Sequence, residues 1–210
     1  MNRERRIKCF WMVPLEKCRY WARTYEPTED SQPKCPVTGS FHNASVLMGD
    51  GEMEYYNHSS GNKFLRMKDE PDPPWNMYPK VCDCGYTFTR AATRHVLHRQ
   101  LYKRADTGEE VTVEEAPVGA MWNSWWYGKW AQGSDGMSLT VKTPGGEWVI
   151  DNRCSNCTLP DDNVHKCWVR HGEPPDITVD KNGVTCSAGA GSIAQPGYHG
   201  FLRGGYLEEC

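Results

Sequence analysis

The ten cysteines constrain this chain of 210 residues more than any other feature of its sequence. An even number of cysteines in a secreted protein predicts disulfides. The opening residues are basic, but no apolar stretch and no small-residue cleavage site of a signal peptide follows them. We therefore expect reduced thiols, some of them metal ligands, in a protein that is not exported. A domain that forms disulfides in an oxidising compartment is the alternative.

The spacing of the cysteines points to zinc. Zinc prefers four sulfur or imidazole ligands in a tetrahedron, and a C-x2-C turn supplies two of them. The predicted ligands are one such turn, two residues that follow it and a second close pair: Cys154, Cys157, His165, Cys167, Cys82 and Cys84. Buried free thiols are the competing interpretation, because cysteine is a common small core residue. A zinc ion with four protein ligands stabilises a fold and leaves no position for a catalytic water.

Glycine and proline favour turns and short strands over long helices. The chain has 20 Gly and 14 Pro, and its second half contains several hairpin patterns. The expected strand pairs are 138–142 with 147–151, 177–179 with 184–186 around Asn182-Gly183, and 199–202 with 206–209. A further hairpin is expected around the turn 105–108, with a strand at 111–113. The fold class predicted is α+β, a small twisted antiparallel sheet with one or two short helices and long loops, stapled by zinc.

The predicted helix lies in the tryptophan-rich segment. Trp122, Trp125, Trp126 and Trp130 recur at helical spacings. Pro117 suits a first helical turn, and acidic residues precede it. We expect a short helix that buries one aromatic face, with a base-stacking platform as the alternative.

A proline-rich segment suggests the domain boundary. Three prolines fall within residues 71–74, which fit neither a helix interior nor a central strand. The expected organisation is an irregular, Cys-containing N-terminal extension at 1–70 and a β-rich domain at 75–210. The basic segment 90–104 is followed directly by acidic residues, so we expect a solvated, salt-bridged face there, not a nucleic-acid patch. The formal charge of −3 and the lack of a long apolar stretch argue against a nucleic-acid coat and a membrane span.

A second chemical signal lies near the C-terminus, where small residues precede Ser192. Backbone N–H groups of Gly191 and Ser192 are the candidate oxyanion donors, and His199, seven residues on, is the candidate base. Asp180 is the candidate third group, with Asp176 and Asp151 as alternatives. A glycine-rich turn with a capping hydroxyl, beside an ordinary strand histidine, explains the same residues without catalysis.

The remaining candidates are weaker. His171 suits a metal ligand, a strand cap or a base, and Cys186 suits a nucleophile but has no basic neighbour in sequence to lower its pKa. The other histidines have no evident partner: His42, His58, His95 and His98.

Several segments together resemble a family carried by bacteriophages and some bacteria, for which no activity is established. They include Asp83-Cys84-Gly85-Tyr86 and the segments 9–10, 116–122, 151–158, 167–172, 178–183 and 186–193. The last thirty residues are also similar to a bacterial family encoded beside ubiquitin-like conjugation genes and proposed to be serine peptidases. Ser192-Ile193 and the strand around His199 match its order. No proline precedes Ser192, however, and the aromatic residue precedes His199 instead of following it.

These observations lead to three functional hypotheses. The first is a phage-encoded, zinc-stabilised serine hydrolase that acts on a peptide or isopeptide in the host cytoplasm. The second is a non-enzymatic virion component of the capsid or tail, because aromatic residues are enriched in interface cores. The third is a zinc-binding adaptor for a host protein or a nucleic acid.

Overall fold

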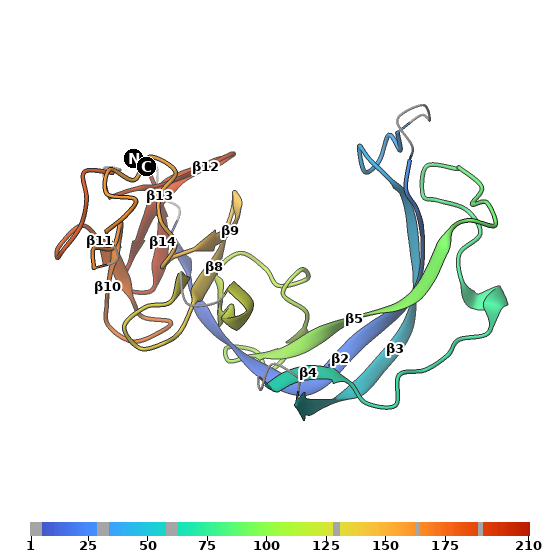
Figure 1. Ribbon diagram of the computed structural model, residues 1–210. Helices are drawn as coiled ribbons and strands as arrows, with labels where there is room; N and C mark the ends of the chain where they lie inside the picture. Colours follow the sequence, from blue (N-terminus) through green and yellow to red (C-terminus); the bar gives the residue numbers. More distant parts are fainter. Residues whose placement is uncertain (1–5, 29–33, 58–62, 128–130, 163, 189–190) are drawn as a thin grey trace. The chain divides into compact units, whose positions relative to one another are not determined.

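The protein is all-β. The computed structural model describes all residues except 1–5, 29–33, 58–62, 128–130, 163 and 189–190 (Figure 1). Within the described part of the chain there is no α-helix, and the strands form three sheets. Two short 3-10 helices interrupt them, η1 (Trp75–Met77) and η2 (Trp125–Tyr127). The α+β prediction is therefore wrong, and no described helix could cross a membrane.

The chain divides into two compact units. Unit 1 comprises residues 1–13 and 103–210, and unit 2 comprises residues 14–102. The chain passes from unit 1 to unit 2 within strand β2 (Phe10–Glu26) and returns within strand β5 (Thr93–Arg104). The segment 71–74, where a boundary was expected, lies inside unit 2 instead.

Unit 2 is built from long strands. Here β2 pairs antiparallel with β3 (His42–Asn57), which pairs with β4 (Lys63–Met67), and β5 pairs with β2 (Figure 1). Side chains alternate along β2, so that Ala22, Thr24 and Glu26 are buried and the residues between them are half-exposed. The expectation of an irregular segment at 1–70 is wrong, because β2, β3 and β4 lie within it. Small or polar residues such as Ala22, Thr24 and Glu26 occupy many of the buried positions, which hides the alternation in the sequence.

The described buried clusters of unit 2 are small. One contains Cys35, Ala44, Cys82, Phe88 and Ala92, and the other contains Cys18, Met53 and Met67. Clusters of this size contribute little hydrophobic stabilisation by themselves, so a metal ion bound beside them would add to the stability of the unit.

Unit 1 has the larger core and the shorter strands. Its first sheet has the order β1 (Arg6–Lys8), β14 (Tyr206–Glu209), β13 (Tyr198–Arg203) and β12 (Ile193–Gln195). A second set pairs β7 (Ala120–Asn123) with residues 10–11 and with β8 (Leu139–Thr143), which pairs with β9 (Gly146–Val149). β6 (Glu110–Val111) pairs with β5, and β10 (Val169–His171) pairs with β11 (Thr178–Asp180). Fully buried side chains such as Met121, Leu139 and Ile177 fill the core between them.

Three of the four predicted hairpins are confirmed. β8 with β9, β13 with β14, and β5 with β6 pair as expected. The hairpin around Asn182-Gly183 is wrong, because β11 pairs with β10. The Asp180 carboxylate accepts hydrogen bonds from the backbone N–H and the side-chain amide of Asn182. Thr185 instead forms a parallel bridge with Lys166.

The predicted tryptophan helix is also wrong. Trp122 lies in β7, fully buried, opposite Thr140 of β8, and Trp125 begins the 3-10 helix. The segment between Gly119 and Gly128 is too short to form a stable helix, and cross-strand pairing in a buried sheet outweighs the helical spacing. Trp130 lies outside the described residues.

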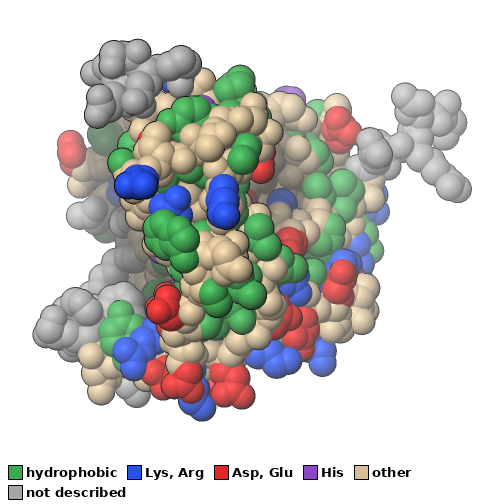
Figure 2. Space-filling model, turned by 90° about the vertical axis from the view of Figure 1, so that its right-hand side faces the viewer, with side chains coloured by type: hydrophobic (Ala, Val, Ile, Leu, Met, Phe, Trp, Pro, Cys, Tyr) green, Lys and Arg blue, Asp and Glu red, His purple; other side chains and the backbone are tan. Residues whose placement is uncertain are grey.

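The surface carries mixed charge. Figure 2 shows Lys and Arg, Asp and Glu, and hydrophobic side chains interspersed over the face that it presents. This mixture agrees with the small net charge of the sequence.

Candidate functional site

Among the residues that the structure describes, each unit contains one cluster of four potential metal ligands. The cluster of unit 2 comprises Cys35, His42, Cys82 and Cys84, and that of unit 1 comprises Cys157, His165, Cys167 and Cys186. Within each cluster the donor atoms lie within 4.8 Å of one another. Both clusters could therefore hold a metal ion.

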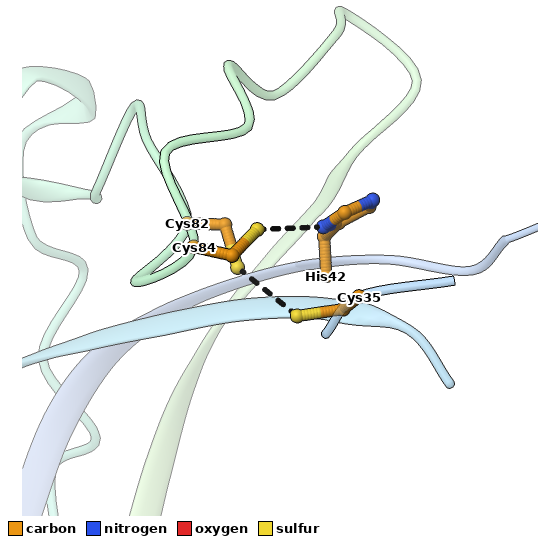
Figure 3. Close-up of side chains that lie close together, drawn as sticks. All are labelled: Cys35, His42, Cys82 and Cys84. Atoms are coloured by element: carbon orange, nitrogen blue, oxygen red, sulfur yellow. Dashed lines mark hydrogen bonds between the residues drawn. The ribbon is translucent and has the colours of Figure 1, made fainter. Parts of the chain in front are cut away.

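The unit 2 cluster joins three segments of the chain (Figure 3). Cys35 precedes a tight turn closed by the Gly39 N–H donating to its carbonyl oxygen, His42 begins β3, and the Cys82 and Cys84 pair lies in the loop before β5. The Cys35 and Cys82 sulfurs are 3.8 Å apart, and the Cys84 sulfur is 3.3 Å from Nδ1 of His42. With metal–sulfur bonds of about 2.3 Å and metal–nitrogen bonds of about 2.0 Å, a tetrahedron has edges of about 3.8 Å and 3.5 Å. The observed spacings match these edges.

Neighbouring groups orient the ligands of this cluster. The His42 ring stacks on Tyr86 with ring centres 3.9 Å apart and an interplanar angle of 8°. The backbone N–H of Asn43 donates to the Cys82 sulfur over 3.3 Å. Burial favours the neutral Cys35 thiol, but hydrogen bonds from Thr38 and Val37 outweigh it and lower the Cys35 pKa to about 6. N–H donors of this kind stabilise the thiolate that a metal requires.

The unit 1 cluster has the same chemistry. The Cys157 sulfur lies 3.3 Å from Nε2 of His165 and 3.9 Å from the Cys186 sulfur, which in turn lies 3.6 Å from the Cys167 sulfur. His165 is buried, and its Nδ1 lies 2.9 Å from the carbonyl oxygen of Asp162. Donation of the Nδ1 proton to that carbonyl leaves the Nε2 lone pair directed at the sulfurs, as in metal-bound histidines.

The thiols of unit 1 differ in acidity. Burial raises the pKa of Cys167 to about 12, and the Cys157 and Cys186 thiols act in the same direction. Burial also acts to raise the pKa of Cys186, but backbone hydrogen bonds from Thr158 and Ala188 outweigh it and lower that pKa to about 6. Of these two thiols, Cys186 is therefore the one whose surroundings favour the thiolate. A bound cation would favour the thiolate of Cys167 as well.

The sequence identified part of both clusters. Cys157, His165 and Cys167 meet as predicted, but Cys82 and Cys84 belong to a separate cluster in unit 2. Cys154 is not one of the four clustered donors of unit 1. Its carbonyl oxygen accepts the N–H of Cys157 in the C-x2-C turn, and burial raises the pKa of its thiol. The ligands that the sequence did not reveal are Cys35, His42 and Cys186.

The Ser192 and His199 side chains are in contact. Ser192 directly precedes β12 and His199 lies in β13, and the pairing of Ala194 with His199 brings the two elements together. The distance from Nε2 of His199 to the Ser192 hydroxyl oxygen is 3.0 Å. Gly191, before the serine, has a φ of +84°, a conformation that glycine adopts without strain.

Ser192 also lines a cleft of unit 1 with a volume of about 620 Å³. Trp148 and Trp168, whose rings meet edge to face at 5.5 Å, line the same cleft. Its polar lining includes Glu147, whose pKa is raised by burial, and Asn152.

Asp180 is not the partner of His199. Its carboxylate lies 2.9 Å from Nε2 of His171 and accepts two hydrogen bonds from Asn182. Burial acts to raise the Asp180 pKa, but these hydrogen bonds outweigh it and lower the pKa. Asp151 is bound to Arg170, and no carboxylate contact with His199 occurs among the described residues. The assignment of Asp180 as third catalytic group is therefore wrong, and the contact is a dyad.

Comparisons with known proteins add no further constraint. No family model matches the chain, and no match was found among curated proteins or solved structures either. The similarities to a bacteriophage family and to the serine peptidase-like family therefore stay expectations from the sequence.

Proposed function

We propose that this is a zinc-binding protein in which each unit is held together by one structural zinc ion. The observation that carries the proposal is the pair of Cys3His clusters, each with three buried ligands and one half-buried ligand, whose spacings match a tetrahedron. Sulfur and imidazole donors in this combination favour zinc over the harder cations magnesium and calcium. Four protein ligands in each cluster leave no open position for a water or substrate, so the ions would stabilise the fold and take no part in catalysis.

Metal analysis tests this proposal. We expect about two zinc ions per chain in purified protein by mass spectrometry. Cys82→Ser should remove the ion of unit 2, and Cys157→Ser should remove the ion of unit 1. Cys210→Ser, an exposed cysteine outside both clusters, is the matched control and should retain both ions. Full zinc content in either cluster variant would contradict the assignment.

A second variant tests the role of Cys154. It belongs to the C-x2-C turn, yet it is not among the four clustered donors. We expect Cys154→Ser to retain both ions. Loss of one ion would show that Cys154 replaces a donor of the unit 1 cluster.

The second function that we propose is hydrolysis at the Ser192–His199 dyad. The 3.0 Å contact beside a cleft is the specific support for it. Ser192 Oγ would attack the acyl carbon of a peptide or isopeptide while His199 Nε2 accepts the hydroxyl proton. The backbone N–H groups of Gly191 and Ser192 would stabilise the oxyanion. His199 would then return the proton to the leaving amine, and water would hydrolyse the resulting ester.

A fluorophosphonate probe separates this second function from a purely structural serine. We expect the wild type to be labelled, Ser192→Ala to lose the label, and His199→Gln to react at least about 100-fold more slowly, because general base catalysis contributes about 10²–10⁴-fold. Ser155→Ala is the matched control, because Ser155 is an exposed serine that lines the same cleft. Equal labelling of Ser192→Ala and wild type would exclude the dyad as a nucleophilic site.

A further inference from the structure

Unit 2 carries an aromatic pocket that neither metal cluster uses. Arg23, Tyr25, Pro27, Phe41 and His95 line it, and its volume is about 390 Å³. Three segments supply them: Arg23 and Tyr25 lie in β2, Phe41 directly precedes β3, and His95 lies in β5.

The pocket lies on the exposed side of these strands. Arg23 and Tyr25 alternate with the buried residues Ala22, Thr24 and Glu26, so their side chains point to the opposite face of the sheet. The pocket is therefore a surface feature assembled across neighbouring strands.

The rings of the pocket are arranged edge to face. The Tyr25 ring centre lies 6.3 Å from that of Phe41 at an interplanar angle of 75°, and 5.6 Å from that of His95 at 80°. No two of these rings are stacked flat on each other, so a planar ligand can lie parallel to one of them. Burial, and then the charge of Arg23, lower the pKa of His95, against the opposing effect of the Glu70 carboxylate, and so favour the neutral ring.

Arg23 gives the pocket a positive charge. Its guanidinium carbon lies 5.5 Å from the ring centre of Tyr25 and 5.8 Å from that of Phe41. Its Nε donates to the side-chain oxygen of Asn43 over 2.6 Å, which fixes the guanidinium beside the rings. In the ion pairs found among the described residues, Arg23 has no carboxylate partner.

These features select the chemistry of the ligand. Arg23 repels a cation such as a methylated ammonium, which aromatic cages otherwise accept. A neutral sugar or an apolar side chain makes no use of the charge. A nucleotide offers both a planar aromatic face and an adjacent negative phosphate.

We propose that this pocket binds a nucleotide of single-stranded DNA or RNA, with the base stacked on the ring of Tyr25 or Phe41 and the phosphate beside Arg23. Exposed aromatic side chains on a sheet surface are the means by which several unrelated folds hold unpaired bases. The sheet face extends beyond the pocket through half-exposed Trp21 and its exposed cross-strand neighbour Leu47, which offers a path for adjacent nucleotides. A duplex cannot use the site, because its bases are already stacked on each other.

Fluorescence anisotropy of the full-length, zinc-loaded protein tests this proposal, with fluorescein-labelled oligo(dT) and oligo(U) as probes. Loss of the ring that holds the base, in Tyr25→Leu or Phe41→Leu, should raise the Kd about 5- to 150-fold, because stacking on one ring contributes about 1–3 kcal/mol per base. Arg23→Gln should reduce the slope of log K against log salt by about 1 through loss of one phosphate contact. Tyr55→Leu is the matched control, because Tyr55 is 61% exposed on β3 outside the pocket, and it should bind like wild type.

Circular dichroism and zinc content establish that each variant is folded before binding is compared. Several results would overturn the proposal: no anisotropy change with either probe, equal affinity of the pocket variants and wild type, or equal competition by a duplex of the same sequence. Binding of a labelled proline-rich peptide in place of the oligonucleotides would assign the pocket to a peptide and overturn it as well. None of these outcomes depends on the Ser192 dyad, which lies in unit 1.

Discussion

At the scale of single residues, Arg170 bridges two carboxylates of unit 1. Its Nε donates to Asp151 over 2.8 Å, and its terminal nitrogens donate to Asp135 over 2.7 Å and 3.0 Å. The Arg170 side chain is 11% exposed and that of Asp151 is 6% exposed. Burial raises the Asp151 pKa despite the opposing effect of Arg170, which shows how strongly that carboxylate depends on its partner.

Removal of this guanidinium should therefore be costly. We expect Arg170→Met to lower the free energy of unfolding by about 3–5 kcal/mol, because it leaves the Asp151 charge buried and unpaired. Arg203→Met is the matched control: its ion pair with Glu208 spans 3.6 Å and its side chain is 54% exposed, so the change should cost about 1 kcal/mol or less. Urea unfolding of the zinc-loaded variants measures both, and equal losses would contradict the interpretation.

The potential metal ligands differ in how far their proximity could be predicted from the sequence. Cys157, His165 and Cys167 are close in sequence, so their proximity followed from their spacing. Cys186 joins them through the bridge between Lys166 and Thr185, a contact between distant segments that no local pattern encodes. Cys35 and His42 are also far from Cys82 in sequence, and Cys35 and Cys82 are 47 positions apart. Their proximity likewise depends on the fold and not on a local pattern.

At the scale of elements, the turn between β13 and β14 contains two glycines, Gly204 and Gly205, in conformations that favour glycine. Gly204 and Gly205 have φ values of +52° and +76°, which suit a tight hairpin. A side chain at Gly204 meets nothing within 4 Å, whereas at Gly205 it meets an Asp176 carboxylate oxygen at 2.7 Å and backbone atoms at 3.0 Å and 3.1 Å.

The two substitutions should therefore differ. We expect Gly204→Ala to cost about 1 kcal/mol, which is the strain of a left-handed alanine. Gly205→Ala should cost more, because the backbone of the Asp176 segment must also move. Thermal unfolding of the two variants compares them directly, and an equal loss for both would show that the Asp176 segment yields easily.

The elements also show which predictions local signals support. In two of the confirmed hairpins, residues of the turn form hydrogen bonds with the backbone of the same turn. In one of them the Gly145 N–H donates to Thr143 Oγ1. The hairpin at Asn182-Gly183 had an equally strong turn signal. It failed because β11 pairs with β10 and because Cys186 lies in the cluster with Cys157, and these contacts between distant segments outweigh the local preference.

At the scale of the whole molecule, each unit has its own cluster of potential metal ligands among the described residues, so under the proposed assignment loss of one ion should affect one unit. We expect Cys82→Ser to make residues 14–102 sensitive to limited proteolysis while residues 139–209 stay protected, because the described clusters of unit 2 are small and the core of unit 1 is large. Cys210→Ser is the control and should leave the whole pattern unchanged. Mass spectrometry of the fragments locates the cuts, and cleavage spread evenly over both units would contradict independent stabilisation.

The chain of unit 2 is inserted into that of unit 1, so independent folding of unit 1 can be tested by removing the insertion. Unit 2 interrupts unit 1 between Val13 and Lys103, and the chain leaves along β2 and returns along β5. Within unit 1 the backbone N–H of Ala105 donates to the carbonyl oxygen of Trp11 over 2.9 Å. This bond places Trp11 opposite Ala105 on antiparallel strands. Two residues further toward unit 2 on each strand, Val13 therefore lies opposite Lys103, and a two-residue turn is long enough to join them.

Replacement of residues 14–102 by Asn-Gly should therefore yield a folded unit 1. Asn-Gly forms the tight turn whose twist matches an antiparallel hairpin. The shortened chain keeps the large core and the Cys157 cluster, so we expect one zinc ion per chain and cooperative thermal unfolding. Pro-Pro in place of Asn-Gly is the control, because proline lacks the N–H and the positive φ that the turn needs, and it should be less stable. A shortened chain that stays unfolded with zinc present would show that unit 1 depends on unit 2, and the two clusters would then stabilise one cooperative structure.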